Sequence, residues 1–210
     1  MGTITNAIKV KDVVEKFKIG NFVETGTGAG DTLNNVLNFF PAGTNFYTIE
    51  LVDQLYANAL ERFKHIKNLN VLQGYSHEQI KTVISQLDSE PTLFWHDAHF
   101  PGADFGIASY DGEPDPIKRI PLEQELVNVV QSGRDITRDV FVLDDLRVYK
   151  DGPFQYGNWD IRAVVGGDSI DFVYRLFDAT HVIFERFWDQ GYVVMFPKNL
   201  SSAEYNKLMV

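Results

Sequence analysis

Hydrophobic and polar residues form two kinds of pattern along the chain. In some segments hydrophobic residues recur about every 3.6 residues, and in others they form short, nearly continuous apolar runs. The helical spacing predicts helices over residues 7–18, 34–40, 52–64, 76–87, 121–131 and 169–177. The apolar runs predict strands over residues 21–24, 45–50, 69–73, 92–97, 139–143, 181–186 and 191–196. Strands and helices therefore follow one another in regular order over the first two thirds of the chain.

This order predicts the fold class. Repeated strand–helix units indicate an α/β, doubly wound, Rossmann-like sheet that is mostly parallel and has seven strands. The run over 92–97 is almost wholly apolar, as expected of a parallel strand covered on both faces. The last two predicted strands are separated by only four residues, so we expect them to form a C-terminal antiparallel hairpin.

Two segments lack any periodicity and are rich in Gly, Pro and aromatic residues. Residues 98–120 and 150–168 are expected to be substrate or lid loops, because long irregular segments in compact domains are usually functional. Their aromatic side chains either form walls for a ring-shaped ligand or anchor the loops on the core. These side chains are Phe100, Phe105, Tyr110, Phe154, Tyr156 and Trp159.

Length and charge narrow the class of protein. The 210 residues predict a single domain over 1–210, and the chain has no cysteine, which excludes disulfides and thiolate metal sites. A net charge of −10 disfavours a nucleic-acid partner. No apolar run reaches the ~18–20 residues of a membrane helix, and the first residues lack a signal-peptide pattern. We therefore expect a cytoplasmic protein without membrane or nucleic-acid partners.

A glycine-rich loop follows the first predicted strand. Gly26, Gly28 and Gly30 lie between that strand and a helix, where glycines let the backbone approach a ligand closely. Glu50 ends the second predicted strand, 20 residues after Gly30 (50 − 30 = 20). In open α/β sheets a carboxylate at this place binds the ribose hydroxyls of a nucleoside ligand. The linked pattern predicts a nucleoside cofactor.

The loop does not suit a dinucleotide. Asp31 stands where the dinucleotide fingerprint has Gly or Ala, and a carboxylate at a helix N-terminus repels a pyrophosphate. Glu24 adds a second negative charge just before the glycines. Two carboxylates favour a cationic ligand, so an NAD-dependent oxidoreductase is the less favoured alternative.

Together these segments resemble the motif series of the class I S-adenosylmethionine (SAM)-dependent methyltransferases. The resemblance is carried by residues 23–30, 47–50, 73–74 and 95–97 and spans roughly residues 20–145. It implies that SAM is the cofactor, that Glu24, Gly26 and Gly28 flank its methionine part, and that Glu50 binds its ribose. The other cofactor-binding positions implied are Thr25, Thr27, Leu51, Gly74, Tyr75, Ser76 and Asp97.

The segment that follows the third predicted strand differs from that motif series. Related sequences often carry a carboxylate there that recognises the adenine amino group, whereas this chain has Gly74-Tyr75-Ser76-His77. We expect Ser76 to hydrogen-bond the adenine and Tyr75 to stack on it.

Three carboxylates follow the fourth and fifth predicted strands. Asp97 closes the fourth strand, and Asp144 and Asp145 close the fifth. Oxygen ligands in this arrangement suit Mg²⁺ or another divalent cation, which would lower the pKa of a substrate hydroxyl. The pattern is similar to that of metal-dependent sugar O-methyltransferases of the macrocin type. The resemblance implies Asp97, Asp144 and Asp145 as metal ligands, with Asp97 or His99 as the catalytic base.

A reading without metal stays open. In it Asp144 caps the following turn, Asp145 pairs with Arg147, and His99 acts as the base because its ordinary pKa lies near neutral pH. His96 points away from Asp97 along the strand and is expected to be structural.

The acceptor is expected to be a small polar molecule with a hydroxyl group, such as a sugar. Arg147, Arg162 and Lys150 are candidates to hold an anionic acceptor such as a nucleotide sugar. A SAM-binding or scaffold protein without turnover is a further alternative, and a homo-oligomer is compatible with the sequence.

Overall fold

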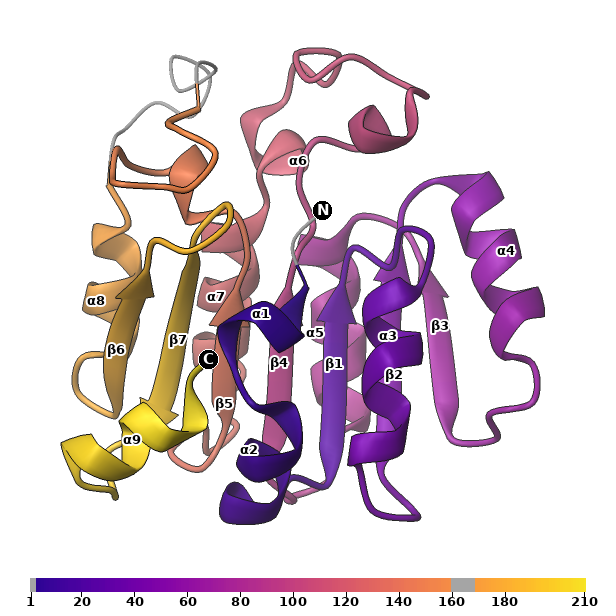
Figure 1. Ribbon diagram of the computed structural model, residues 1–210. Helices are drawn as coiled ribbons and strands as arrows, with labels where there is room; N and C mark the ends of the chain where they lie inside the picture. The colour runs from indigo at the N-terminus through magenta and orange to yellow at the C-terminus, as the bar shows by residue number, and fades with distance from the viewer. Residues whose placement is uncertain (1–2, 160–168) are drawn as a thin grey trace.

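The computed structural model describes residues 3–159 and 169–210 (Figure 1). Its strands form one sheet in the order β3-β2-β1-β4-β5-β7-β6. The strands are β1 (Asn21–Thr25), β2 (Asn45–Glu50), β3 (Leu69–Gln73), β4 (Thr92–His96), β5 (Val140–Leu143), β6 (His181–Arg186) and β7 (Tyr192–Pro197). The first five strands are parallel to one another, and β7 is antiparallel to both β5 and β6. The predicted doubly wound sheet with a C-terminal antiparallel hairpin is confirmed.

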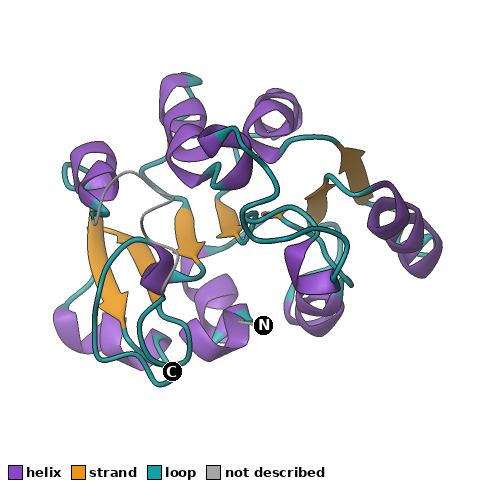
Figure 2. Cartoon of the chain, turned by 90° about the horizontal axis from the view of Figure 1, so that it is seen from above, coloured by secondary structure: helices purple, strands orange, loops and turns teal. Residues whose placement is uncertain are grey.

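Helices cover both faces of this sheet, as the view from above shows (Figure 2). Helices α2, α3, α4 and α9 pack on one face, and α5, α7 and α8 pack on the other. The longer helices are α2 (Val10–Phe17), α3 (Asp31–Val36), α4 (Asp53–Phe63), α5 (Ser76–Gln86), α7 (Leu122–Gln131), α8 (Asp171–Phe177) and α9 (Ser202–Leu208). Short elements are α1 (Ile4–Ala7), α6 (Pro116–Arg119) and three 3₁₀ turns, η1 (Leu37–Phe39), η2 (Ala103–Phe105) and η3 (Leu146–Val148).

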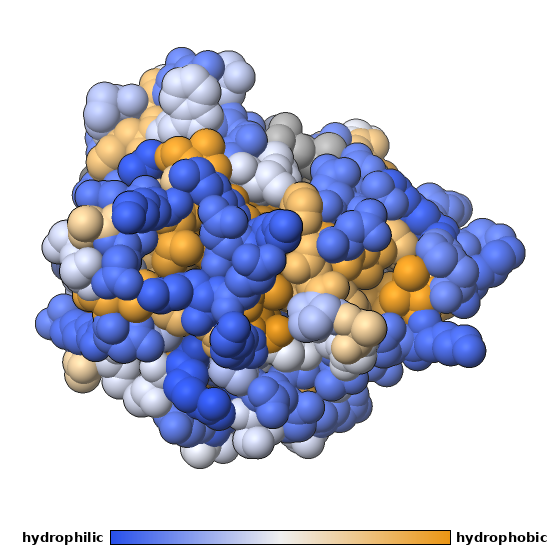
Figure 3. Space-filling model, turned by 60° about the horizontal axis from the view of Figure 1, so that its bottom comes forward, coloured by the Kyte–Doolittle hydropathy of each residue, from blue (hydrophilic) through white to orange (hydrophobic). Residues whose placement is uncertain are grey.

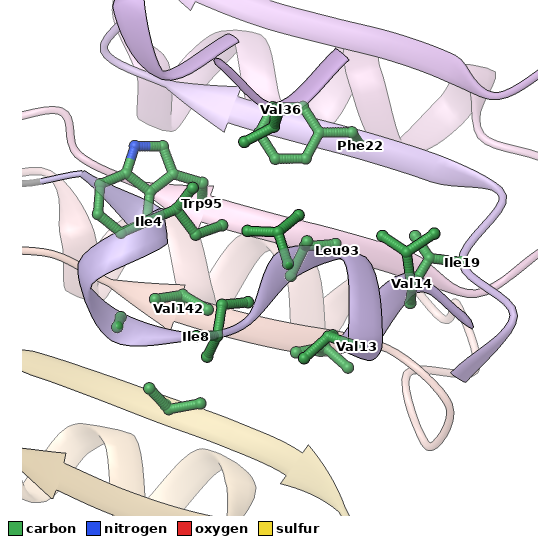
Figure 4. Close-up of a cluster of buried hydrophobic side chains, with 14 of the residues drawn as sticks. Ile4, Ile8, Val13, Val14, Ile19, Phe22, Val36, Leu93, Trp95 and Val142 are labelled. Carbon is green, nitrogen blue, oxygen red and sulfur yellow. The ribbon is translucent and has the colours of Figure 1, made fainter. Parts of the chain in front are cut away.

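Alternation along each strand divides the core between the two faces. Phe22, Leu93 and Trp95 contact the α2–α3 side, which Figure 4 shows in close-up. Phe94 and Phe141 point to the opposite side and stack on each other with centroids 4.8 Å apart. The central strands are therefore buried on both faces, which explains their continuous apolar sequence. The same alternation fixes the direction of every residue at a strand end.

The structure corrects two local predictions and adds one helix. The predicted helix over 7–18 is divided, because Ile8 forms an isolated bridge with Met209 between α1 and α2. Helix α3 begins at Asp31 rather than at the predicted residue 34, and its N-cap residue is Gly30. Helix α9 was not predicted, although Ser201 and Glu204 form a capping box that marks its start.

All parallel strands end at the same edge of the sheet, which is the upper edge in Figure 1. The candidate site residues lie just beyond this edge, as expected for an open α/β sheet. Figure 3 shows the opposite end of the molecule, where hydrophilic groups surround smaller hydrophobic areas. Among the described helices, none has the length and apolar character needed to cross a membrane.

Candidate active site

A cavity of about 330 Å³ lies beyond the carboxyl ends of β1, β2, β4 and β5. Its volume is in the range usual for small-molecule sites. Most of the predicted site residues line it: Gly26, Thr27, Gly28, Glu50, Leu51, Gly74, Tyr75, Ser76, Asp97, His99, Asp144 and Asp145. The predicted cofactor, catalytic and metal-binding positions therefore meet in one cavity.

The glycine loop forms the floor of this cavity. Gly26 has a φ of 80°, and a Cβ atom placed on it would lie 2.6 Å from the carbonyl oxygen of Asp97. The amides of Gly26 and Thr27 both donate to the carbonyl of Ile49, at 3.0 and 3.1 Å. Only glycine fits here, because both the backbone angle and the space exclude a side chain.

Glu50 is held by the loops on either side of it. Its Oε2 accepts a hydrogen bond from the Gly28 amide at 2.8 Å, and its Oε1 accepts one from the Val52 amide at 2.8 Å. Burial raises the pKa of Glu50, and these backbone donors oppose that rise. The carboxyl group is thus oriented in the cavity wall, where its free lone pairs can accept ribose hydroxyls.

Glu24 and Thr25, two predicted cofactor-binding residues, lie behind the wall and do not line the cavity. Glu24 Oε2 accepts a hydrogen bond from Thr48 at 2.6 Å, whereas its Oε1 is buried and has no hydrogen-bond partner. Burial raises the pKa of Glu24 to about 8 despite the hydrogen bond from Thr48. Thr25 turns to the other face of the sheet and bonds to Glu125. Any effect of either side chain on a cofactor is therefore indirect.

The segment after β3 and the loop over 98–120 meet at the far end of the cavity. Tyr75 and Ser76 line it, and the Lys118 Nζ lies 4.7 Å from the centre of the Tyr75 ring. Phe105 comes from the same loop and reaches Gly28, where an added Cβ would lie 3.0 Å from its ring. This end of the cavity offers aromatic surfaces and the Ser76 hydroxyl, which suit an adenine.

Three carboxyl groups and one imidazole stand at the ends of β4 and β5. The carboxyl groups of Asp97 and Asp144 act on each other's pKa, and Asp144 Oδ1 accepts a hydrogen bond from the Asp145 amide at 2.9 Å. Burial first, and then the neighbouring carboxylates, raise the pKa of Asp97 well above its ordinary value. Burial and Asp145 likewise raise the pKa of Asp144 to about 7. The Asp97–Asp144 pair can thus hold a shared proton.

His99 bridges this group. Its Nε2 lies 2.7 Å from Asp145 Oδ2, and its Nδ1 lies 3.7 Å from Asp97 Oδ1. Burial alone would lower the pKa of His99, but Asp145 and Asp144 outweigh it and raise that pKa to about 9. Asp145 thus orients the imidazole and stabilises its protonated form at neutral pH.

The three carboxylates are close together, but each is engaged with other protein groups. Asp145 contacts both His99 and the Arg147 Nε, the latter at 3.6 Å, as the reading without metal expects. No group of three His, Asp or Glu side chains in the described ranges 3–159 and 169–210 has the arrangement of a metal site. The donors suit Mg²⁺ chemically, yet these side-chain positions do not surround a common point. The metal remains a prediction of the sequence.

Asp31, one of the two carboxylates predicted to make the glycine loop acidic, is paired with a cation. Asp31 forms an ion pair with Arg62 at 2.8 Å, from helix α4. Arg62 also donates a hydrogen bond to the Ala29 carbonyl, so this cation from α4 contacts the glycine loop. The sequence of the loop itself gives no sign of this contact.

The two irregular loops join through their aromatic residues. Phe100 stacks on Trp159 at 5.8 Å, and Tyr110 contacts both rings at 5.3 Å. Phe154 packs on Phe187 instead, while Tyr156 is largely exposed. Of the expected ring-binding side chains, Phe100 and Phe105 line the cavity, whereas the other four do not and three of them pack against other rings.

The predicted anion-binding residues are not gathered at the cavity. Lys150 pairs with Glu185 at 2.7 Å, and Arg147 lies 4.5 Å from the Trp159 ring. Arg162 lies outside the described residues. Sequence reasoning also missed Thr3, Asn35 and Gln190, which line the cavity from α1, α3 and the β6–β7 turn.

The sequence matches no protein-family model, and no curated protein matches it. Solved structures do resemble the fold. The SAH-bound methyltransferase PaMTH1 of Podospora anserina superposes with a TM-score of 0.61 and 16% identity, over 90% of this chain and 76% of that one. A putative caffeoyl-CoA O-methyltransferase of Staphylococcus aureus gives 0.60 and 13% identity, over 90% and 80%.

An O-methyltransferase of Bacillus cereus in complex with SAH gives a TM-score of 0.57 and 15% identity, over 90% of this chain and 79% of that one. The chain therefore has the class I SAM-dependent methyltransferase fold, of the kind that O-methyltransferases have.

Proposed function

We propose that this protein is a SAM-dependent methyltransferase that methylates a hydroxyl group of a small polar acceptor, such as a sugar. The observation that carries the proposal is the cavity itself, where the glycine loop, Glu50 and the Asp97–His99–Asp145 group share one wall. Structures of the same fold bound to SAH (S-adenosylhomocysteine) support the choice of cofactor.

The volume and the lining residues of the cavity support this choice of cofactor. Glu50 is oriented for ribose hydroxyls, and Tyr75 and Ser76 are placed for an adenine at one end. The other end is acidic, with Asp97, Asp144 and Asp145 on the wall. A sulfonium and an α-ammonium are favoured by this negative potential, because opposite charges attract strongly in a partly buried site.

His99 is the proposed base. Its pKa of about 9 leaves it mostly protonated at neutral pH, so the base would be its neutral fraction, which grows as the pH rises towards 9. In that form Asp145 holds the Nε2–H, and Nδ1 is the nitrogen that would accept the proton of an acceptor hydroxyl. The methyl group would come from bound SAM, with the new oxygen–carbon bond formed as the carbon–sulfur bond breaks and its electron pair stays on sulfur. The imidazolium that results is stabilised by Asp145. By holding the acceptor in line with the cofactor, the cavity wall would contribute to the rate.

A divalent metal is a separate part of the proposal. Asp97, Asp144 and Asp145 are the residues that would hold it, and Asp145 would exchange His99 and Arg147 for the metal. Bound there, the cation would lower the pKa of the acceptor hydroxyl.

The acceptor is proposed to be uncharged rather than phosphorylated. In the described part of the wall, the cationic side chains are His99, which is paired with Asp145, and Lys118 at the adenine end. Gln190, Thr3 and Asn35 offer neutral hydrogen-bonding groups. These groups suit a sugar or another polyol more than a nucleotide sugar.

Calorimetry with SAH tests the cofactor. We expect micromolar binding, and a titration without heat at about 1 mM SAH would refute the proposal. A panel of neutral, anionic and cationic hydroxyl compounds, followed by SAH formation from SAM, then tests the acceptor. Binding of SAH without turnover on the whole panel would favour the alternative, a SAM-binding protein that lacks catalysis.

A further inference from the structure

Glu125 is a carboxyl side chain in the core beneath the cavity. It lies on α7, is fully buried, and does not line the cavity. Moving a carboxylate from water into a protein core is costly unless other groups bind it. The hydrogen-bond partners of Glu125 therefore indicate its role.

Both described partners of Glu125 lie at strand ends. Its Oε2 accepts a hydrogen bond from Thr25 Oγ1 at 3.1 Å and lies 2.6 Å from His96 Nδ1. Thr25 is the last residue of β1 and His96 the last residue of β4, and the two are register partners in the sheet. Strand alternation turns both side chains to the face that α7 covers. One carboxylate oxygen thus joins the ends of two adjacent strands.

The residues that follow these strand ends are the core of the proposed site. Gly26 follows Thr25, and Asp97 follows His96. The Asp97 amide donates to the Thr25 carbonyl at 3.0 Å, and an added Cβ on Gly26 would lie 2.6 Å from the Asp97 carbonyl oxygen. The glycine loop and the acidic group therefore touch through their backbones. A small shift of one strand end against the other would change the floor of the cavity.

We propose that Glu125 is a positioning residue that holds the glycine loop and Asp97 in register through Thr25 and His96. The proposal rests on the proposed function, because it concerns the cofactor cavity. It also gives Thr25 a defined role: its hydroxyl acts on the cofactor site through Glu125, on the far side of the sheet, and not by contact. Displacements well below 1 Å matter for groups that must be aligned with a ligand.

The decisive comparison is Thr25→Val against Thr25→Ser. Valine keeps the shape of threonine and loses the hydroxyl, whereas serine keeps the hydroxyl and loses the methyl group. With SAH as the probe in calorimetry, we expect Thr25→Val to weaken binding about 10-fold and Thr25→Ser to stay within twofold of wild type. Equal weakening in both variants, or Thr25→Val within twofold of wild type, would overturn the proposal.

A separate variant tests whether a general loss of protein stability is enough to weaken SAH binding. Val140 is fully buried at the first residue of β5, far along the strand from the site, so Val140→Ala should lower the Tm without changing SAH affinity. If Val140→Ala weakens SAH binding as much as Thr25→Val at a similar Tm, the effect is one of stability and the proposal fails.

A second pair of variants does not depend on Thr25. Glu125→Gln removes the charge and keeps the shape, and we expect SAH binding to weaken about fivefold. Glu123 lies on the same helix, exposed and paired with Arg175 at 2.9 Å, so Glu123→Gln should leave binding unchanged. Equal affinities in both variants would overturn the proposal. If wild type itself does not bind SAH, the proposed function fails instead, so the two failures are distinguishable.

Discussion

The Nε2 atom of His99 lies 2.7 Å from the Oδ2 atom of Asp145, and this contact joins the loop after β4 to the end of β5. Burial opposes a charge on His99, but Asp145 and Asp144 raise the pKa of His99 from 6.5 to about 9. The pair therefore has consequences for stability as well as for the proposed role of His99 as a base.

A group whose pKa is raised by folding stabilises the protein below its unfolded pKa and loses that effect as the pH rises through its folded pKa. We therefore expect the contribution of His99 to be complete below pH 6.5 and lost towards pH 9. The Tm of His99→Gln should fall less over this range than that of wild type, measured by calorimetry. His65→Gln, at an exposed site, is the control. Parallel curves for His99→Gln and wild type would contradict the assignment.

Removal of the Glu50 carboxylate should weaken cofactor binding. The ribose hydroxyls would lose a charged hydrogen-bond acceptor worth ~1.5–3 kcal/mol, which corresponds to roughly a 10- to 100-fold rise in the Kd for SAH. Calorimetry of Glu50→Ala against Glu61→Ala, an exposed position on α4, provides the measurement. Unchanged affinity in Glu50→Ala would remove Glu50 from the site.

Gly26→Ala should abolish SAH binding, because its Cβ would meet the Asp97 carbonyl oxygen at 2.6 Å. Gly133→Ala is the matched control, since Gly133 has the same φ of 80° and nothing within 4 Å of an added Cβ. Both variants carry the backbone strain of about 1 kcal/mol expected of alanine at positive φ. Equal SAH affinities in the two variants would show that the contact with Asp97 does not matter.

Mg²⁺ binding, predicted from the sequence, should depend on pH. Burial and like charges raise the pKa of Asp97 well above its ordinary value and that of Asp144 to about 7. A metal must therefore displace protons, and its affinity should rise about 10-fold between pH 6 and pH 8. Titration of Mg²⁺ into the SAH-loaded protein measures this, and Asp144→Asn should abolish the heat while SAH binding remains. No heat at any pH up to about 10 mM Mg²⁺ would remove the metal from the proposal.

The strands were predictable because their apolar runs are short and bounded by turn residues. Strands β2 and β3 begin and end where the pattern predicts, at Asn45–Glu50 and Leu69–Gln73. Helix ends were less accurate, since they depend on tertiary contacts such as the bridge between Ile8 and Met209. The positions of most site residues followed from the same regularity, because the ends of parallel strands meet at one edge.

The missed residues have a common cause. Thr3, Asn35 and Gln190 reach the cavity only because α1, α3 and the β6–β7 turn are folded over it, which no local pattern indicates. The contact of Glu125 with Thr25 joins residues 100 positions apart, and the pair between Arg62 and Asp31 spans 31 positions. Local sequence patterns identify which residue types follow a strand, but not which distant side chain neutralises or holds them.

The charge of the cavity wall affects what happens after a reaction. The wall carries six carboxyl groups, those of Asp31, Glu50, Asp97, Asp104, Asp144 and Asp145. Its net negative charge is smaller than this number, because Asp31 is paired with Arg62, Asp145 is paired with His99, and burial raises the pKa of Asp97 and Asp144. When a methyl group leaves a sulfonium, the spent cofactor becomes a thioether and loses one positive charge. The attraction that drew the fresh molecule in is therefore weaker for the used one. If the proposed function holds, the negative charge that remains on the wall would favour the fresh cofactor over the spent one and so limit product inhibition.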